Sequence, residues 1–191
     1  MAAFRKIRKP GKDEYPGYSH IYMDLLKDDD LILDHLHENF FKIKEFIYSL
    51  PVEKLIYRYA ENKWTIKEIL VHVTDTERIF ACRALRYARN DNTPLHGFKQ
   101  DDYAKCSYAD RRSLDNIFEE YWVVRNATIS LFQNLPEDSF MRSGGGLDDH
   151  GNIINVRTVR AWVYHIAVHE LRHIKIIKER YLDIRIDGDI I

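Results

Sequence analysis

Four long segments that contain neither proline nor glycine limit the folds open to this chain. They cover residues 30–50, 65–90, 113–135 and 158–183, about half of the sequence. Because proline and glycine both destabilise helix interiors, long helices can form there. Each segment repeats apolar residues at three- and four-residue steps, as Ile66, Ile69, Leu70 and Val73 do in the second. This spacing is typical of amphipathic helices that bury one face.

Residues at the segment ends support the same helices. Thr65 and Glu68 have the spacing of a capping box, and Ser113 and Thr158 are suitable N-cap residues. Prolines directly follow the first and third segments, where the residue before a proline leaves the helical conformation. Four helices of about 30–40 Å predict an all-α protein, a four-helix bundle that occupies residues 1–191 as one domain.

The connections between the helices carry weaker signals. Residues 91–112 can cross the bundle, so the second and third helices are expected to run parallel. Residues 136–157 predict a small hairpin, in which Gly144–Gly146 is interpreted as a flexible turn because no phosphate-loop lysine follows. Residues 1–29 are expected to wrap the bundle as an irregular segment.

Charge and composition exclude several classes of partner. The chain has 29 Lys and Arg against 30 Asp and Glu, a net charge of −1, so it lacks the positive excess that attracts nucleic acid or anionic membranes. No apolar run approaches the ~20 residues that span a bilayer, and the N-terminus lacks the apolar core of a signal peptide. Two cysteines without a CxxC motif fit a reducing compartment. We therefore expect a cytoplasmic protein.

Three histidines in the last segment form the strongest chemical signal. His165, His169 and His173 are spaced four residues apart, so they share one helix face with Trp162 and Ile166. A buried imidazole costs free energy unless a partner satisfies it, and a divalent metal ion does so. Packing of these histidines among tyrosines and carboxylates is the alternative.

Spacing leaves the ligand pair open. His165 and His173 are about 12 Å apart along the helix, too far to share an ion, so the pair is either 165/169 or 169/173. His72 on the second segment is the candidate for a third ligand, because it lies beside the apolar seam of Ile69 and Val73. Three histidines leave a coordination position for water, as in catalytic sites.

Residues 169–173 also spell HExxH, the motif in which zincin peptidases use a glutamate, here Glu170, as general base. Ile176 and Glu179 stand where the extended metzincin motif has Gly and His, and no set of strands precedes the motif. Both observations disfavour a peptidase.

Several stretches resemble the DinB-like superfamily, and especially its YfiT-like branch of metal-dependent hydrolases. They are WTIKEILVHVTDTER at 64–78, RALRYAR at 83–89, YWVVRNATISLFQNL at 121–135 and HIAVHELRH at 165–173. The resemblance extends over roughly residues 28–183. It implies an up-down-down-up bundle and a divalent ion, nickel or zinc, held by three histidines.

Carried over to this sequence, the resemblance assigns the ligands to His72, His169 and His173 and leaves His165 to packing or support. Some relatives transfer low-molecular-weight thiols such as bacillithiol, so the implied partner is a small molecule. A homodimer is also implied. The ion then activates either water for hydrolysis or a thiol for S-transfer. The alternative to an enzyme is a non-catalytic helical bundle that binds metal and serves in a stress response.

Possible helper residues have two interpretations each. Asp75 could orient a ligand or lie solvated on its helix. Glu77 and Glu170 could act as general bases or pair with surface arginines (Arg78, Arg83 and Arg172). Arg125 could bind an anion or form a buried salt bridge. Cys82 is predicted in the core and Cys106 on a linker.

Overall fold

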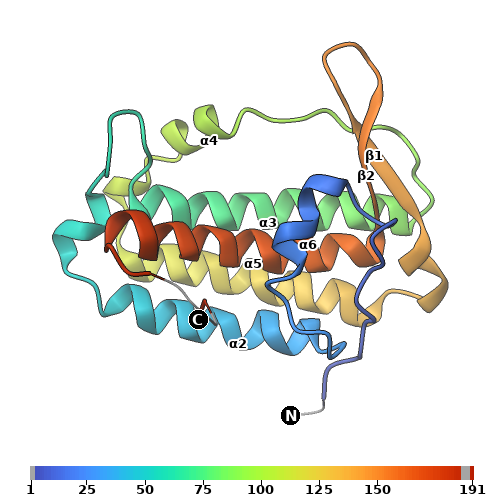
Figure 1. The fold of residues 1–191 in the computed structure, drawn as a ribbon, viewed down its shortest axis with the longest axis horizontal. Helices are drawn as coiled ribbons and strands as arrows, with labels where there is room; N and C mark the ends of the chain where they lie inside the picture. Colours follow the sequence, from blue (N-terminus) through green and yellow to red (C-terminus); the bar gives the residue numbers. More distant parts are fainter. Residues whose placement is uncertain (1–2, 186–189) are drawn as a thin grey trace.

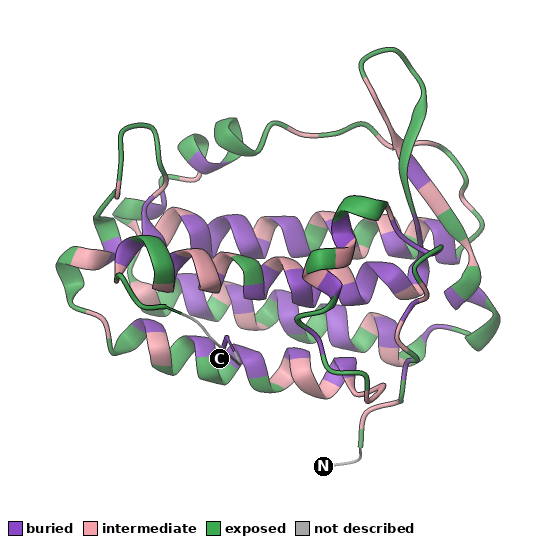
Figure 2. Ribbon diagram, viewed as in Figure 1, coloured by how far each residue is buried: buried purple, intermediate pink, exposed green. Residues whose placement is uncertain are grey.

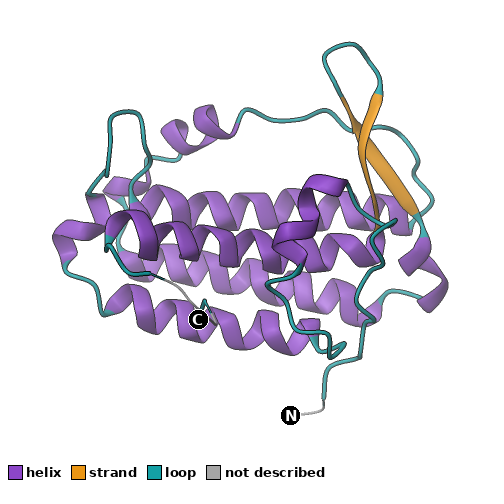
Figure 3. Ribbon diagram, in the orientation of Figure 1, coloured by secondary structure: helices purple, strands orange, loops and turns teal. Residues whose placement is uncertain are grey.

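Four long helices form the body of the protein in a computed structural model that describes residues 3–185 and 190–191 (Figure 1). They are α2 (Ile32–Tyr48), α3 (Ile66–Ala88), α5 (Leu114–Asn134) and α6 (Val159–Ile176), and α6 continues into a π-helical turn, Ile177–Tyr181. The four helices predicted from the sequence are confirmed. Figure 3 shows that the remaining structure is short helices, one hairpin and loops.

The four helices follow the predicted up-down-down-up order. In Figure 1, α3 and α5 run in one direction while α2 and α6 run in the other. The crossover between α3 and α5 extends along the bundle and carries α4 (Gln100–Cys106) and a short 3-10 turn, Ala109–Arg111. This long connection is what allows two successive helices to be parallel.

Side-chain caps begin the helices where the sequence predicts them. The Thr65 hydroxyl accepts from the Glu68 amide at 3.1 Å, and the Glu68 carboxylate accepts from the Thr65 amide at 2.8 Å. Ser113 and Thr158 accept from amides three residues on, both at 3.1 Å. These bonds satisfy amides that otherwise lack partners in the first helical turn.

The predicted hairpin consists of β1 (Ser143–Leu147) and β2 (Ile153–Thr158), paired antiparallel with a register shift between Gly144 and Gly146. The interpretation of Gly144–Gly146 as a flexible turn is wrong, because these glycines form β1. A Cβ on Gly144 would overlap the buried Tyr87 ring, and the Tyr87 hydroxyl donates to the Gly145 carbonyl at 2.9 Å. Glycine is needed so that the strand can lie on that ring.

The N-terminal segment lies against α6 and the end of β2. It contains the 3-10 turn Gly17–Ser19 and α1 (His20–Met23). The Thr158 amide donates to the Glu14 carbonyl at 3.1 Å, and the Tyr164 hydroxyl donates to the Ile7 carbonyl at 2.6 Å. Among the described residues, no helix combines the length and hydrophobicity needed to cross a membrane.

Buried residues recur along all four long helices, as the colouring of Figure 2 shows, and they form the core. The prediction that Cys82 lies in this core is wrong, since its side chain is exposed. It lines an apolar surface groove between α3 and α5 with Leu85 and Val123. Successive helix positions are about 100° apart around the axis, so the apolar repeat locates the buried face only coarsely. It does not distinguish a residue at the edge of that face, such as Cys82, from a residue in its centre.

Candidate metal centre

Three histidines from two antiparallel helices meet between α3 and α6. The Nε2 atom of His169 lies 3.3 Å from Nε2 of His72 and 3.2 Å from Nε2 of His173. One ligand nitrogen from each residue lies within 4.8 Å of the other two. Of the two pairs that spacing allowed, the structure therefore brings 169/173 together with His72.

The separations of these nitrogens fit a shared ion. Two imidazole nitrogens bound to one tetrahedral ion at metal–nitrogen distances of about 2.0–2.1 Å lie about 3.3 Å apart. The two measured Nε2 separations agree with that value. His72, His169 and His173 could thus hold one divalent ion.

Burial keeps the three imidazoles neutral. Loss of solvent lowers the pKa of His72 to about 4 and that of His173 to about 3. The pKa of His169 lies well below its ordinary value because of burial and then the neighbouring histidines. Neutral imidazoles have a free lone pair, which a metal ligand requires.

Thr76 orients His169 and was not singled out from the sequence. Its hydroxyl oxygen lies 3.3 Å from His169 Nδ1, and the same hydroxyl is 2.7 Å from the His72 carbonyl, to which it donates. The oxygen can then accept from Nδ1–H, which leaves the lone pair on Nε2. Since Thr76 is four residues after His72, the i, i+4 spacing was a signal for it.

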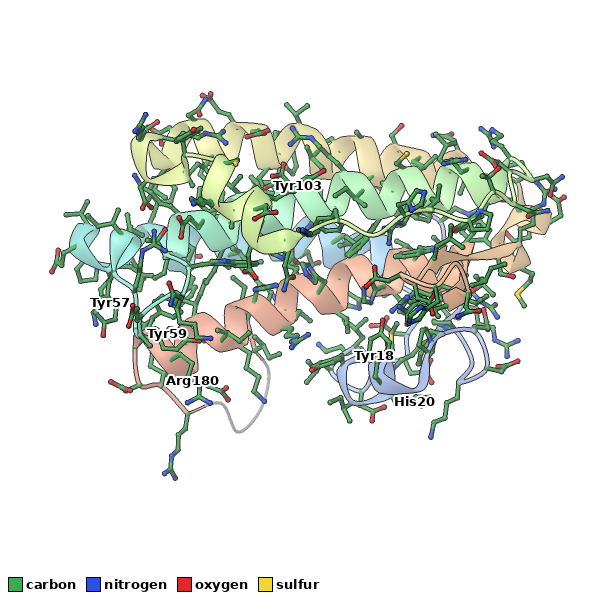
Figure 4. The ribbon with its side chains drawn as sticks, turned by 90° about the horizontal axis from the view of Figure 1, so that it is seen from above. Tyr18, His20, Tyr57, Tyr59, Tyr103 and Arg180 are labelled. Carbon is green, nitrogen blue, oxygen red and sulfur yellow. The ribbon has the colours of Figure 1, made fainter. Side chains whose placement is uncertain are left out.

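Trp64 and Asp101 lie where the three histidines approach the surface. The Trp64 ring centroid is 4.6 Å from that of His72, and the Trp64 indole donates to Asp101 at 3.1 Å. A cleft with an empty volume of about 490 Å³ adjoins them, and its lining includes His173, Tyr59 and Tyr181. Figure 4 shows Tyr59 near Tyr57 at this end of α6. The cleft gives solvent a route to His173.

A comparison with protein-family models relates this chain to known proteins. The model for the DinB superfamily matches residues 36–177. The chain belongs to the DinB superfamily. The resemblance seen in the sequence motifs is therefore confirmed.

A solved member of this fold shows the same architecture. YfiT from Bacillus subtilis superposes with a TM-score of 0.70 at 14% sequence identity, over 83% of this chain and 89% of that chain. It is described as a probable metal-dependent hydrolase with an unusual four-helix bundle topology. At this identity the likeness shows a shared fold. No curated protein matches the chain.

His165 lies outside the three-histidine group of this DinB-superfamily bundle. Its ring packs at 4.9 Å from Phe80 and 5.8 Å from Trp162, measured between centroids, and 6.3 Å from His169. Burial, followed by nearby arginines, lowers its pKa to about 3. It is a neutral side chain one helical turn from the site.

Glu77, Glu170 and Arg125 form a buried ion cluster away from the three histidines. Arg125 Nη2 lies 2.9 Å from Glu77 Oε2 and also pairs with Glu170, which accepts from the Tyr121 hydroxyl. The two carboxylates therefore do not pair with surface arginines. Adjacent helical residues point about 100° apart, so Glu170 faces α5 when His169 faces α3.

Asp75 also lies apart from the three histidines. Its carboxylate is 3.2 Å from the Arg78 guanidinium and half-buried on α3, where burial raises its pKa. The interpretation as a carboxylate on the helix surface fits this position. Cys106 lies at the end of α4 and is exposed.

Proposed function

We propose that this chain is a divalent-metal-dependent hydrolase of small molecules, with one nickel or zinc ion held by His72, His169 and His173. The observation that carries the proposal is the convergence of three imidazole nitrogens, from the buried His72 and the half-buried His169 and His173, beside an open cleft. The description of YfiT as a probable metal-dependent hydrolase supports it.

The ion, when bound, would supply Lewis acidity that lowers the pKa of a coordinated water or thiol toward neutrality. The chain's own residues supply orientation. Thr76 holds the His169 ring, and Trp64 covers the His72 ring, which keeps bulk water from one side of the imidazoles.

Asp101 is the carboxylate in the lining of the cleft and is the group we assign to accept a proton from the attacking nucleophile. Its Oδ1 atom accepts from the Trp64 indole, which fixes the carboxylate at the cleft. Its negative charge opposes the lowering of the His72 pKa, so the two groups interact electrostatically. A general base must lie within reach of the proton that it takes.

Metal content tests the proposal first. The purified, untagged protein is compared with His72→Ala, His169→Ala and His173→Ala, and His165→Ala is the matched control on the same helix. We expect about one equivalent of metal in the wild type and in the control, and loss in the other three. No metal after refilling with nickel or zinc would overturn the proposal.

Substrate assays then separate the two chemistries that one site could support. Activated esters test hydrolysis, and a low-molecular-weight thiol with an electrophile tests S-transfer. Hydrolysis that disappears in His169→Ala supports the proposal. Consumption of thiol without hydrolysis replaces it with the transferase, and metal binding without either activity replaces it with a non-catalytic role.

A further inference from the structure

Hydrogen-bond donors without acceptors gather where α6 begins. In the described part of the chain, three buried side-chain nitrogens have no hydrogen-bond partner. They are Arg157 Nε, Trp162 Nε1 and His165 Nδ1. They belong to one cluster, since the Arg157 guanidinium lies 5.0 Å and the His165 ring 5.8 Å from the Trp162 ring centroid. Buried polar groups in folded proteins are nearly always satisfied. The cluster therefore lacks an acceptor.

Two positive charges in this cluster also lack counter-ions. Arg157 is 3% exposed, and its hydrogen bonds go to the Asn155 carbonyl, the Tyr18 hydroxyl and the Ser19 hydroxyl. Arg83 lies 5.6 Å from the same Trp162 ring and donates to the His96 carbonyl at 3.1 Å. All of these acceptors are neutral.

Among the described residues, the other buried arginine, Arg125, and the half-buried Arg160 are both neutralised. Arg125 pairs with Glu77 and Glu170, and Arg160 pairs with Glu14. Over residues 3–185 and 190–191, no carboxylate lies within 4.0 Å of the guanidinium nitrogens of Arg83 or Arg157. An arginine stays charged when buried, and a buried charge without a counter-ion costs free energy.

An apolar ring connects this cluster with the three histidines. The Phe80 centroid lies 4.9 Å from that of His165 and 5.5 Å from that of His169. His165 and His169 are themselves 6.3 Å apart between centroids. One aromatic ring therefore separates the cluster from the three histidines. Figure 4 shows Tyr18 at the opposite end of α6 from Tyr59.

We propose that Arg83, Arg157, Trp162 and His165 bind an oxyanion, a carboxylate or a phosphate, at one end of the substrate while its electrophilic group lies at the three histidines. Guanidinium groups bind both anions with paired, charge-assisted hydrogen bonds. The indole N–H and the His165 Nδ1–H tautomer add neutral donors. The inference deepens the proposed function, on which its catalytic meaning rests, and makes the substrate a small anionic electrophile.

The Trp162 indole proton is a direct reporter of the anion. The ¹⁵N-labelled protein, with its metal, is titrated separately with inorganic phosphate and with acetate, and Trp162→Phe identifies the resonance. We expect a saturable downfield shift of the Trp162 indole proton, because a new acceptor deshields it. The anion that binds more tightly identifies the class of substrate. No saturable shift with either anion would overturn the proposal.

Arginine variants assign the binding to this cluster. Arg83→Gln is expected to weaken anion binding about tenfold or more, since a charged hydrogen bond is lost. Arg89→Gln, an exposed arginine at the end of the same helix, is the matched control and should leave it unchanged. Equal affinities in the two variants would contradict the site. Arg157→Gln should weaken anion binding as Arg83→Gln does, and circular dichroism checks that this variant is folded. If Arg157→Gln unfolds, the result for the half-exposed Arg83 alone tests the site.

A further variant separates this inference from the proposed function. His173→Ala should lose the metal but keep the Trp162 shift on addition of phosphate. A shift in a wild type that holds no metal would support the anion site while the hydrolase fails. A wild type that holds metal, with no shift of the indole proton, would keep the hydrolase and reject the anion site.

Discussion

The hydroxyl oxygen of Thr76 lies 3.3 Å from Nδ1 of His169, and the same hydroxyl donates to the carbonyl of His72 one turn earlier on α3. One threonine thus connects the backbone of one proposed ligand with the ring of another. This connection sets which nitrogen of His169 carries the proton, and it ties the rotation of α6 to that of α3.

Replacement of Thr76 tests this connection. Thr76→Val keeps the shape but removes the acceptor, so metal affinity should fall about 10–100-fold, as for outer-shell partners in other metal sites. Competition with a chelator measures it. Thr74→Val is the matched control, because within the described part of the chain the Thr74 hydroxyl bonds only to the Leu70 carbonyl on the same helix. Equal losses in both variants would contradict the orienting role.

Glu170→Gln distinguishes this site from a zincin peptidase. The Glu170 carboxylate pairs with Arg125 and accepts from Tyr121, away from the three histidines. We expect full metal content and a lower melting temperature, since one partner of a buried ion cluster is neutralised. A variant with normal stability that lost peptide hydrolysis would instead restore the peptidase.

Arg125→Met should destabilise the bundle strongly. It leaves Glu77 and Glu170 buried without their positive partner, and breaking a buried pair in this way costs about 3–5 kcal/mol. Urea unfolding measures the loss. Arg111→Met, an exposed arginine, is the control. Replacement of all three residues with apolar ones should recover much of the stability, and a failure to do so would show that the cluster itself is stabilising.

Acid should destabilise the metal-free protein before its carboxylates titrate. Burial lowers the pKa of His72 to about 4 and those of His165 and His173 to about 3, from an ordinary 6.5. Between pH 6.5 and these lowered pKa values, the histidines of the unfolded chain bind protons and those of the folded chain do not. The free energy of unfolding therefore falls as pH falls. Each histidine contributes roughly 1.4 kcal/mol per pH unit below about 6.5.

Denaturant unfolding from pH 7 to pH 4.5 checks this dependence. His165→Phe removes one of the titrating groups without touching the proposed ligands, and the slope should decrease by the share of one histidine. A stability that stays constant over this range would show that the histidines are not desolvated in solution.

Gly144→Ala should weaken the hairpin and its contact with α3. The new methyl would overlap the buried Tyr87 ring, and overpacking of this kind costs about 1–3 kcal/mol. Thermal unfolding measures the effect. Gly97→Ala is the control, because nothing lies within 4 Å of a Cβ at that position. Similar melting temperatures for the two variants would contradict the packing.

The sequence by itself determined the elements that rest on local interactions. The apolar repeats and the caps at Thr65, Ser113 and Thr158 depend on residues within four positions of one another, so the four helices could be predicted from them. The common helix face of His165, His169 and His173 followed from the same periodicity. The family resemblance then gave the order of the helices and the choice of the pair His169 and His173 over His165 and His169.

Only the tertiary structure decided which residues of the neighbouring helices each helix face contacts. The rotation of α6 against α3 brings His169 and His173 close to His72, places Thr76 beside His169, and turns Glu170 toward Arg125. The same packing brings Arg157 and Arg83, 74 positions apart in the sequence, to one Trp162 ring. These contacts join distant residues through helix rotation and register, and a local apolar pattern is compatible with several rotations and registers.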